Sequence, residues 1–142
     1  MYKQCIVAGV VFIGLVILPA FLLADDIPLA QENIVKMGVD FTWTEKHTCR
    51  GPSPKIKVSN VPSPVLQFTV YLRDMTKPGY FHGGGIVQKR YNKIIKEGEL
   101  KSYYGPCFTD GPPRKFVMRV YGLDVDGRVV AYGEKILPFP ID

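Results

Sequence analysis

The clearest strand in this chain is the stretch VLQFTVYLR, which occupies residues 65–73. From position 66 to position 72 the even-numbered residues are apolar, whereas the odd-numbered residues from 67 to 73 are Gln, Thr, Tyr and Arg. Successive side chains of a strand point to opposite faces, so this pattern predicts a strand that buries its even-numbered side. Trp43, the only tryptophan, is expected to be buried against that apolar face.

The sequence on both sides of 65–73 predicts further short strands separated by turn residues. Strands are expected at 41–44, 56–58, 83–87, 116–123 and 129–132, with an ambiguous edge strand and turn within 91–100. Val125-Asp126-Gly127-Arg128 carries the Asp-Gly pair of a tight hairpin. Since no segment has a helical stripe longer than two turns, the sequence predicts an all-β sandwich or barrel.

Residues 1–24 differ in composition from the rest of the chain. After a short basic start, residues 5–24 are uncharged and apolar, and two aspartates follow at 25 and 26. This pattern predicts either a signal peptide cleaved near Ala24 or an N-terminal membrane anchor, since the run is long enough to span a bilayer. Both alternatives export the remainder, as a periplasmic, secreted or membrane-anchored protein. Residues 25–40 are expected to lead into one β domain at 41–142.

The exported part is mildly basic and carries charges of both signs. Lys3 is the only one of the 18 Lys and Arg residues within 1–24, so 17 cations stand against 13 Asp and Glu in the remainder. A nucleic-acid-binding protein needs a concentrated basic stripe with stacking aromatic residues, and only 88–93 approaches one. A solvated surface explains these charges more simply, so nucleic acid is not expected as a partner.

Cysteine usage predicts one disulfide. Cys5 belongs to the apolar N-terminal run, which leaves Cys49 and Cys107 as the pair in the exported part. An oxidising compartment favours a bond between them, and two buried thiols are the alternative. The two cysteines and two histidines of that part lack the spacing of metal ligands, so no metal site is expected.

The sequence His82-Gly83-Gly84-Gly85 follows Asp74 closely and has two interpretations. A flexible, donor-rich glycine run beside an acid and an imidazole can form a small polar pocket. The same letters occur in the oxyanion hole of lipases, but those enzymes need a G-x-S-x-G elbow and a parallel α/β sheet, which this chain lacks. The chain also lacks H-E-x-x-H, G-x-x-x-x-G-K-[ST] and G-x-G-x-x-G, which argues against the metallohydrolase and nucleotide-binding classes they mark.

Three loops carry residue types that bind an anion if the fold brings them together. They are 74–78 with the following His82, then 104–107, then 111–114, whose Arg114 enters a strand. Backbone amides near glycines can hold an anion, and arginine can pair with it through two hydrogen bonds. The structural alternative is that Asp74 caps a turn, Arg114 is a surface charge and His82 is a packed loop residue.

The order of these motifs resembles the phosphatidylethanolamine-binding protein family, in its bacterial Raf-kinase-inhibitor-like branch. Along the chain the motifs are Ser53-Pro54, Asp74-x-Thr76-x-Pro78, His82, Gly105-Pro106-Cys107 and Arg114-Lys115-Phe116. The resemblance covers residues 41–139. It implies a compact antiparallel β-sandwich with Greek-key-like connections and little helix, and a small pocket for phosphate-like head groups. It implies no catalytic activity and no cofactor.

The chain departs from the family pattern at several pocket positions. Thr76 stands where the family has a second aspartate, Arg114 where it has a second histidine, and Phe116 where it has a tyrosine. If Arg114 points inward, the pocket has lost an acid and an imidazole and gained a permanent cation, which favours anions at neutral pH. The same departures fit a degenerate site on a scaffold used for something else.

Together these features predict an exported, non-enzymatic binding protein with a small anion pocket. Its expected ligand is a small anion or a phospholipid head group, and the expected ligand-binding residues are Asp74, Thr76, His82, Gly105, Pro106 and Arg114. One alternative is a protein-interaction module with a vestigial pocket. Another is a small secreted hydrolase that uses Asp74 and His82 as an acid/base pair. Membrane contact is expected only if the N-terminal segment is retained.

Overall fold

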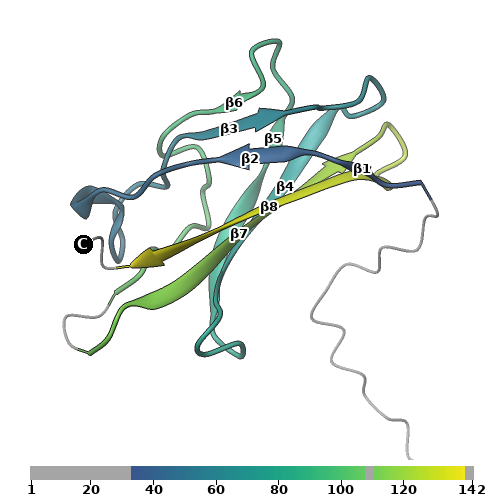
Figure 1. Cartoon of the computed structure of the whole chain (residues 1–142). Helices are drawn as coiled ribbons and strands as arrows, with labels where there is room; N and C mark the ends of the chain where they lie inside the picture. Colours follow the sequence, from purple (N-terminus) through teal and green to yellow (C-terminus); the bar gives the residue numbers. More distant parts are fainter. Residues whose placement is uncertain (1–32, 108–110, 140–142) are drawn as a thin grey trace, which may run out of the picture.

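The computed structural model describes residues 33–107 and 111–139, which form two β-sheets (Figure 1). The larger sheet has the order β1-β8-β7-β4-β5, and the smaller has the order β2-β3-β6. In chain order the elements are β1 (Val35–Lys36), β2 (Gly38–Asp40), the 3-10 helix η1 (Glu45–His47), β3 (Ile56–Ser59), β4 (Gln67–Asp74), β5 (Phe81–Gln88), β6 (Ile94–Ile95), β7 (Arg114–Leu123) and β8 (Val129–Phe139). The expected signal or anchor at 1–24 lies outside the described residues. Within 33–107 and 111–139, no helix has the length and apolar character needed to cross a membrane.

Strand β4 is central to the larger sheet because it pairs with a strand on each side. It runs antiparallel to β5, with Val70 opposite Gly85, and antiparallel to β7, with Val70 opposite Val120. After β5 the chain crosses to β6 in the smaller sheet and returns as β7 beside β4, a Greek-key-like connection. β8 pairs antiparallel with β7, and β1 pairs parallel with β8. The expected antiparallel β-sandwich with little helix is confirmed.

The alternation predicted for β4 holds along the strand. Phe68, Val70 and Leu72 are buried, and Asp74 continues on the same inward face with only 2% of its surface exposed. Leu66 lies before the strand and is 47% exposed, so the apolar face begins at Phe68. The same alternation that buries the apolar side chains therefore also turns the Asp74 carboxylate inward at the end of the strand.

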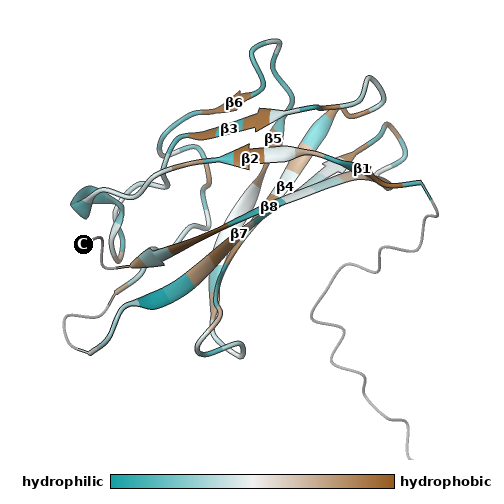
Figure 2. Cartoon of the chain, viewed as in Figure 1, coloured by the Kyte–Doolittle hydropathy of each residue, from teal (hydrophilic) through white to brown (hydrophobic). Residues whose placement is uncertain are grey.

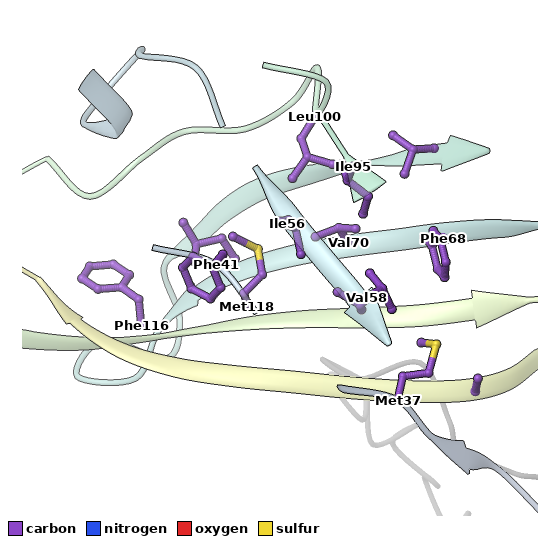
Figure 3. Close-up of a cluster of buried hydrophobic side chains, with 14 of the residues drawn as sticks. Met37, Phe41, Ile56, Val58, Phe68, Val70, Ile95, Leu100, Phe116 and Met118 are labelled. Carbon is purple, nitrogen blue, oxygen red and sulfur yellow. The ribbon is translucent and has the colours of Figure 1, made fainter. Parts of the chain in front are cut away.

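One hydrophobic cluster fills the space between the sheets (Figure 3). The smaller sheet contributes Ile56, Val58 and Ile95, and the larger sheet contributes residues that include Val70 and Met118. Figure 2 shows the contrast between the apolar stretches of β3 and β6 and the hydrophilic turn at η1. Burying each large side chain of this kind contributes roughly 1.5–3 kcal/mol, so the cluster is the main source of stability.

Trp43 is buried as expected, in the same core cluster as the apolar side chains of β4. Its indole ring makes edge contacts with Phe41, Phe116 and Phe139, at 5.0, 6.3 and 6.0 Å between ring centroids. The expected strand at 41–44 is wrong, because these residues form no sheet ladder. Two buried aromatic side chains, rather than strand pairing, fix the path of this segment against β7 and β8.

The β domain begins before residue 41. Residues 35–36 and 38–40, which were expected to lead into it, form β1 and β2 and pair with β8 and β3. Met37 between them is buried in the core. Strands of two or three residues are too short to show an alternating pattern, so the sequence offered no sign of them.

The glycine run belongs to the buried strand β5, which confirms the strand expected at 83–87 and corrects the interpretation of the run as a flexible pocket loop. Gly83 and Gly84 are buried within β5, and Gly84 exchanges two backbone hydrogen bonds with Ser102, at 3.2 and 3.0 Å. Gly83 has a φ of +72°, and a Cβ at this position would lie 1.7 Å from the Ser102 carbonyl oxygen. Glycine is needed here because the 100–103 segment approaches β5 backbone to backbone.

Cys49 and Cys107 form the expected disulfide, with their Cα atoms 4.6 Å apart. Two backbone hydrogen bonds accompany it: Cys49 N–H donates to the Pro106 carbonyl at 3.0 Å, and Gly105 N–H donates to the Cys49 carbonyl at 2.7 Å. The bond therefore fastens the segment after η1 to the 103–107 segment. The alternative of two buried thiols is wrong.

Gly83→Ala is expected to lower the free energy of unfolding by about 2–4 kcal/mol, because the added methyl group meets the Ser102 carbonyl in an unfavourable backbone conformation. Gly79→Ala is the matched control, since a Cβ there would meet nothing within 4 Å. Chemical denaturation followed by circular dichroism measures both variants. Equal stability of the two variants would contradict the close backbone approach described for β5.

Replacing both cysteines with Cys49→Ser and Cys107→Ser is expected to cost about 4 kcal/mol of unfolding free energy, because the bond closes a loop of 58 residues in the unfolded chain. Denaturation of wild type with and without reductant gives an independent measure of the same effect. Reductant should destabilise wild type and leave the double variant unchanged. If reductant leaves the unfolding free energy of wild type unchanged, the prediction is wrong.

Candidate functional site

Asp74 anchors the site at the inner end of β4. Its Oδ1 accepts backbone hydrogen bonds from Thr76 N–H at 2.7 Å and Lys77 N–H at 3.2 Å. Its Oδ2 lies 3.4 Å from Nη1 of Arg114 at the start of β7. A carboxylate with this little exposure needs such partners, because an unpaired buried charge is costly. Asp74 therefore caps the turn after β4 and also joins that turn to β7.

His82 lies on the neighbouring strand β5 and is 4% exposed. Its Nδ1 is 3.0 Å from the Tyr104 carbonyl oxygen, so this nitrogen carries the proton and donates it to that carbonyl. The ring packs edge-on against Tyr80 and Phe116, at 4.9 and 5.2 Å between centroids. The group that orients His82 is thus the Tyr104 carbonyl and not the Asp74 carboxylate.

The three side chains Asp74, His82 and Arg114 border one cavity of about 260 Å³. The rest of its wall is formed by Lys77, Tyr80, Tyr104, Cys107 and Phe116. Among the described residues that border the cavity, Arg114 and Lys77 carry positive charge and Asp74 carries a carboxylate. The site therefore combines a cationic edge with an aromatic wall.

The other three expected ligand-binding residues lie elsewhere. Thr76 is exposed and contributes its backbone N–H to Asp74, and it does not border the cavity. Gly105 and Pro106 are buried behind the cavity wall. A Cβ at Gly105 would lie 2.0 Å from the His47 carbonyl oxygen, so glycine lets this loop pack against η1. Gly105 and Pro106 therefore hold the loop that carries Tyr104.

The support of that loop extends to Tyr103 and His47. The Tyr103 hydroxyl donates to the His47 carbonyl at 2.8 Å, and burial raises the pKa of Tyr103 well above its usual range. Tyr103 therefore remains a protonated donor at any physiological pH. His47 is held in turn by Thr44, whose backbone N–H donates to Nδ1 at 2.9 Å. These contacts and the disulfide fix the backbone whose carbonyl orients His82.

The cavity wall includes residues that sequence reasoning did not single out for binding, namely Lys77, Tyr80 and Tyr104. The only feature of the sequence that pointed to these residues is that they lie close to Asp74 or Gly105 along the chain. Phe116 had been noted as a departure from the family pattern, and here it packs on His82. Among the described residues, no group of three or more His, Cys, Asp or Glu side chains could hold a metal ion.

Comparison with known proteins identifies the fold. No protein-family model matches the sequence, and no curated protein matches it. YbcL of Escherichia coli, described as a member of the mammalian PEBP family, superposes with a TM-score of 0.56 at 15% identity over 75% of this chain and 99% of its own. CT736 of Chlamydia trachomatis, described as a proposed phosphatidylethanolamine-binding protein homologue, gives a TM-score of 0.54 at 17% identity with the same coverage. The fold of this chain is therefore that of the phosphatidylethanolamine-binding proteins.

Proposed function

We propose that this chain is an exported, non-enzymatic binding protein whose cavity takes up a small phosphate-like anion. The observation that carries the proposal is the charge of the cavity: Arg114 and Lys77 both face it, whereas the Asp74 carboxylate already receives two backbone N–H groups and Arg114. An arginine offers planar paired donors that match phosphate oxygens. The cysteine bond between residues 49 and 107 supports export, since such bonds persist in oxidising compartments.

His82 supplies a contact whose character depends on protonation. Because Nδ1–H is committed to the Tyr104 carbonyl, Nε2 is the nitrogen through which the ring can meet a ligand in the cavity. When neutral, Nε2 accepts a hydrogen bond, for example from a protonated phosphate ester; when the ring is charged, Nε2 becomes a cationic donor. Both states suit a phosphate group, and the charged state suits a dianion better.

The size of the cavity limits the ligand. A volume of about 260 Å³ is below the usual range for a drug-sized molecule, and it fits a head group better than a whole phospholipid. Tyr80, Tyr104 and Phe116 give the carbon part of a head group an aromatic wall. Inorganic phosphate, phosphoethanolamine and glycerophosphoethanolamine are therefore the probes that distinguish a free phosphate site from a lipid head-group site.

The geometry favours binding over hydrolysis. An acid/base pair needs a group that can exchange a proton with substrate, and the Asp74 oxygens are instead occupied by Thr76, Lys77 and Arg114. The carbonyl that orients His82 cannot take the proton of its Nδ1, so the imidazole lacks a carboxylate partner of the kind that serine hydrolases use.

A protein-interaction module with a vestigial pocket is the second candidate. The observation in its favour is that Thr76, which stands where the family has an aspartate, faces solvent, while Phe116 packs on the His82 ring. Binding of any of the three phosphate probes separates the two candidates, because a ligand that binds only the folded state raises its stability.

Arg114→Ala is expected to abolish the stabilisation by phosphate or a phosphorylated head group at neutral pH. In wild type, ligand at about ten times its Kd adds about 1.4 kcal/mol to the unfolding free energy. Because Arg114 also contacts buried Asp74, the variant loses about 2 kcal/mol without ligand, so the quantity to compare is the gain on adding ligand. Thermal unfolding with and without each probe measures this gain.

The matched control is Arg128→Ala, which removes the same charge from an exposed side chain in the β7–β8 turn. This variant should keep the full ligand gain. If phosphate stabilises wild type and Arg114→Ala equally, the cavity role of Arg114 is wrong. If none of the three probes stabilises wild type, the vestigial-pocket candidate replaces the proposal.

A further inference from the structure

Three loops lie at the end of the sandwich where β4 begins (Figure 1). The cavity residues Asp74 and Arg114 lie at the other end, where β4 ends and β7 begins. The three loops are 60–66 between β3 and β4, 89–93 between β5 and β6, and 124–128 between β7 and β8. Backbone hydrogen bonds join them, because Lys89 N–H donates to the Leu66 carbonyl and Leu66 N–H donates to the Leu123 carbonyl, both at 2.8 Å. The loops therefore form one continuous surface, called here the loop end.

Each loop exposes one large apolar side chain at the loop end. Tyr91 is exposed over 101% of its reference surface, Val125 over 80% and Leu66 over 47%. Single exposed apolar residues are ordinary on a protein surface, but here three of them stand on adjoining loops. Tyrosine combines an apolar ring with a polar hydroxyl, and side chains of this kind are enriched where membrane meets water.

Cations surround the most exposed of these side chains. Lys89 and Lys93 flank Tyr91 within a single loop, and Arg90 of the same loop pairs with Glu99 at 2.5 Å. The two acids of the neighbouring loop are engaged locally: Asp124 accepts the backbone N–H groups of Asp126 and Arg128, and Asp126 pairs with Arg128. The loop end therefore offers the positive charge of Lys89 and Lys93 around the tip at Tyr91.

The chain also enters the domain at the loop end. Val35 at the start of β1 lies opposite Ala131, close to where β8 begins after the 124–128 loop. The sequence before Val35 contains the uncharged apolar run 5–24, which is long enough to span a bilayer. The ten residues between that run and Val35 span at most about 35 Å, so a retained anchor keeps this end near the bilayer.

We propose that the loop end docks on an anionic phospholipid surface. The apolar tips of Tyr91, Val125 and Leu66 enter the head-group region, and the lysines of the 89–93 loop meet the lipid phosphates. Each cation near such a surface strengthens the attraction by about 1 kcal/mol, which is roughly fivefold in the docking equilibrium. The cavity, at the other end of β4, then faces away from the membrane.

The test reads the environment of each end in the full chain reconstituted in vesicles. Tyr91→Trp places an indole at the loop end, and Tyr80→Trp is the matched control at the cavity end, where Tyr80 is 53% exposed. Trp43 is buried and gives a constant background that surface lipids do not reach. Brominated lipids quench indoles that touch them, so the two variants compare contact directly.

In vesicles that contain phosphatidylglycerol, Tyr91→Trp should lose emission on bromination of the lipid and Tyr80→Trp should not. The loss should disappear in vesicles of phosphatidylcholine alone and at high salt. Adding Lys89→Ala and Lys93→Ala should weaken docking about fivefold for each lysine, while Lys55→Ala with Lys115→Ala, which removes two exposed cations elsewhere, should not.

Three results would overturn the proposal. They are equal quenching at both positions, quenching at the Tyr80 position alone, and no quenching of Tyr91→Trp in anionic vesicles. The last result would leave an acidic protein surface as the partner to examine. None of these results depends on ligand binding in the cavity, so this test and the anion-stabilisation test fail separately.

Discussion

The Asp74 carboxylate is the interaction on which the rest of the candidate site depends. It ends the central strand on the core side, and it is neutralised by two backbone N–H groups and by Arg114. Removing any of these partners would leave a buried charge short of hydrogen bonds, which is far more costly than losing a surface ion pair. The turn after β4 and the start of β7 are thereby held together, and their side chains form the cavity.

The second constraint is the backbone of the 103–107 segment. It is bonded to the segment after η1 by the disulfide and by two backbone hydrogen bonds, and Gly105 allows close packing against His47. The carbonyl of Tyr104 then fixes which nitrogen of His82 carries its proton. The tautomer in the cavity is therefore set by the Tyr104 carbonyl, whose loop the disulfide helps to hold, and it does not depend on Asp74.

The sequence was informative where a pattern repeats and silent where packing decides. The alternation around Val70 predicted the central strand, and the Asp-Gly turn marked the β7–β8 connection. Asp74 was expected in a loop, but it continues the strand on its inward face. The short strands β1 and β2 were missed because two or three residues carry no period. A strand was expected through the glycines after His82, but the approach of Ser102 that requires them was not visible in the sequence. No local sequence pattern indicates that Lys77 and Tyr104 border the cavity, because their positions depend on the paths of their loops.

The length of strand β4 also determines how far the cavity lies from the loop end. Its residues, from Gln67 beside the loop end to Asp74 at the cavity, span about 25 Å, since a strand rises about 3.3 Å per residue. In a domain docked through its loops, the cavity would stand about three Debye lengths above the lipid phosphates at physiological ionic strength. The negative potential of the bilayer is screened out at that distance. An anion from solution would then meet the field of the cavity's own charges, without repulsion from the membrane to which the domain is held.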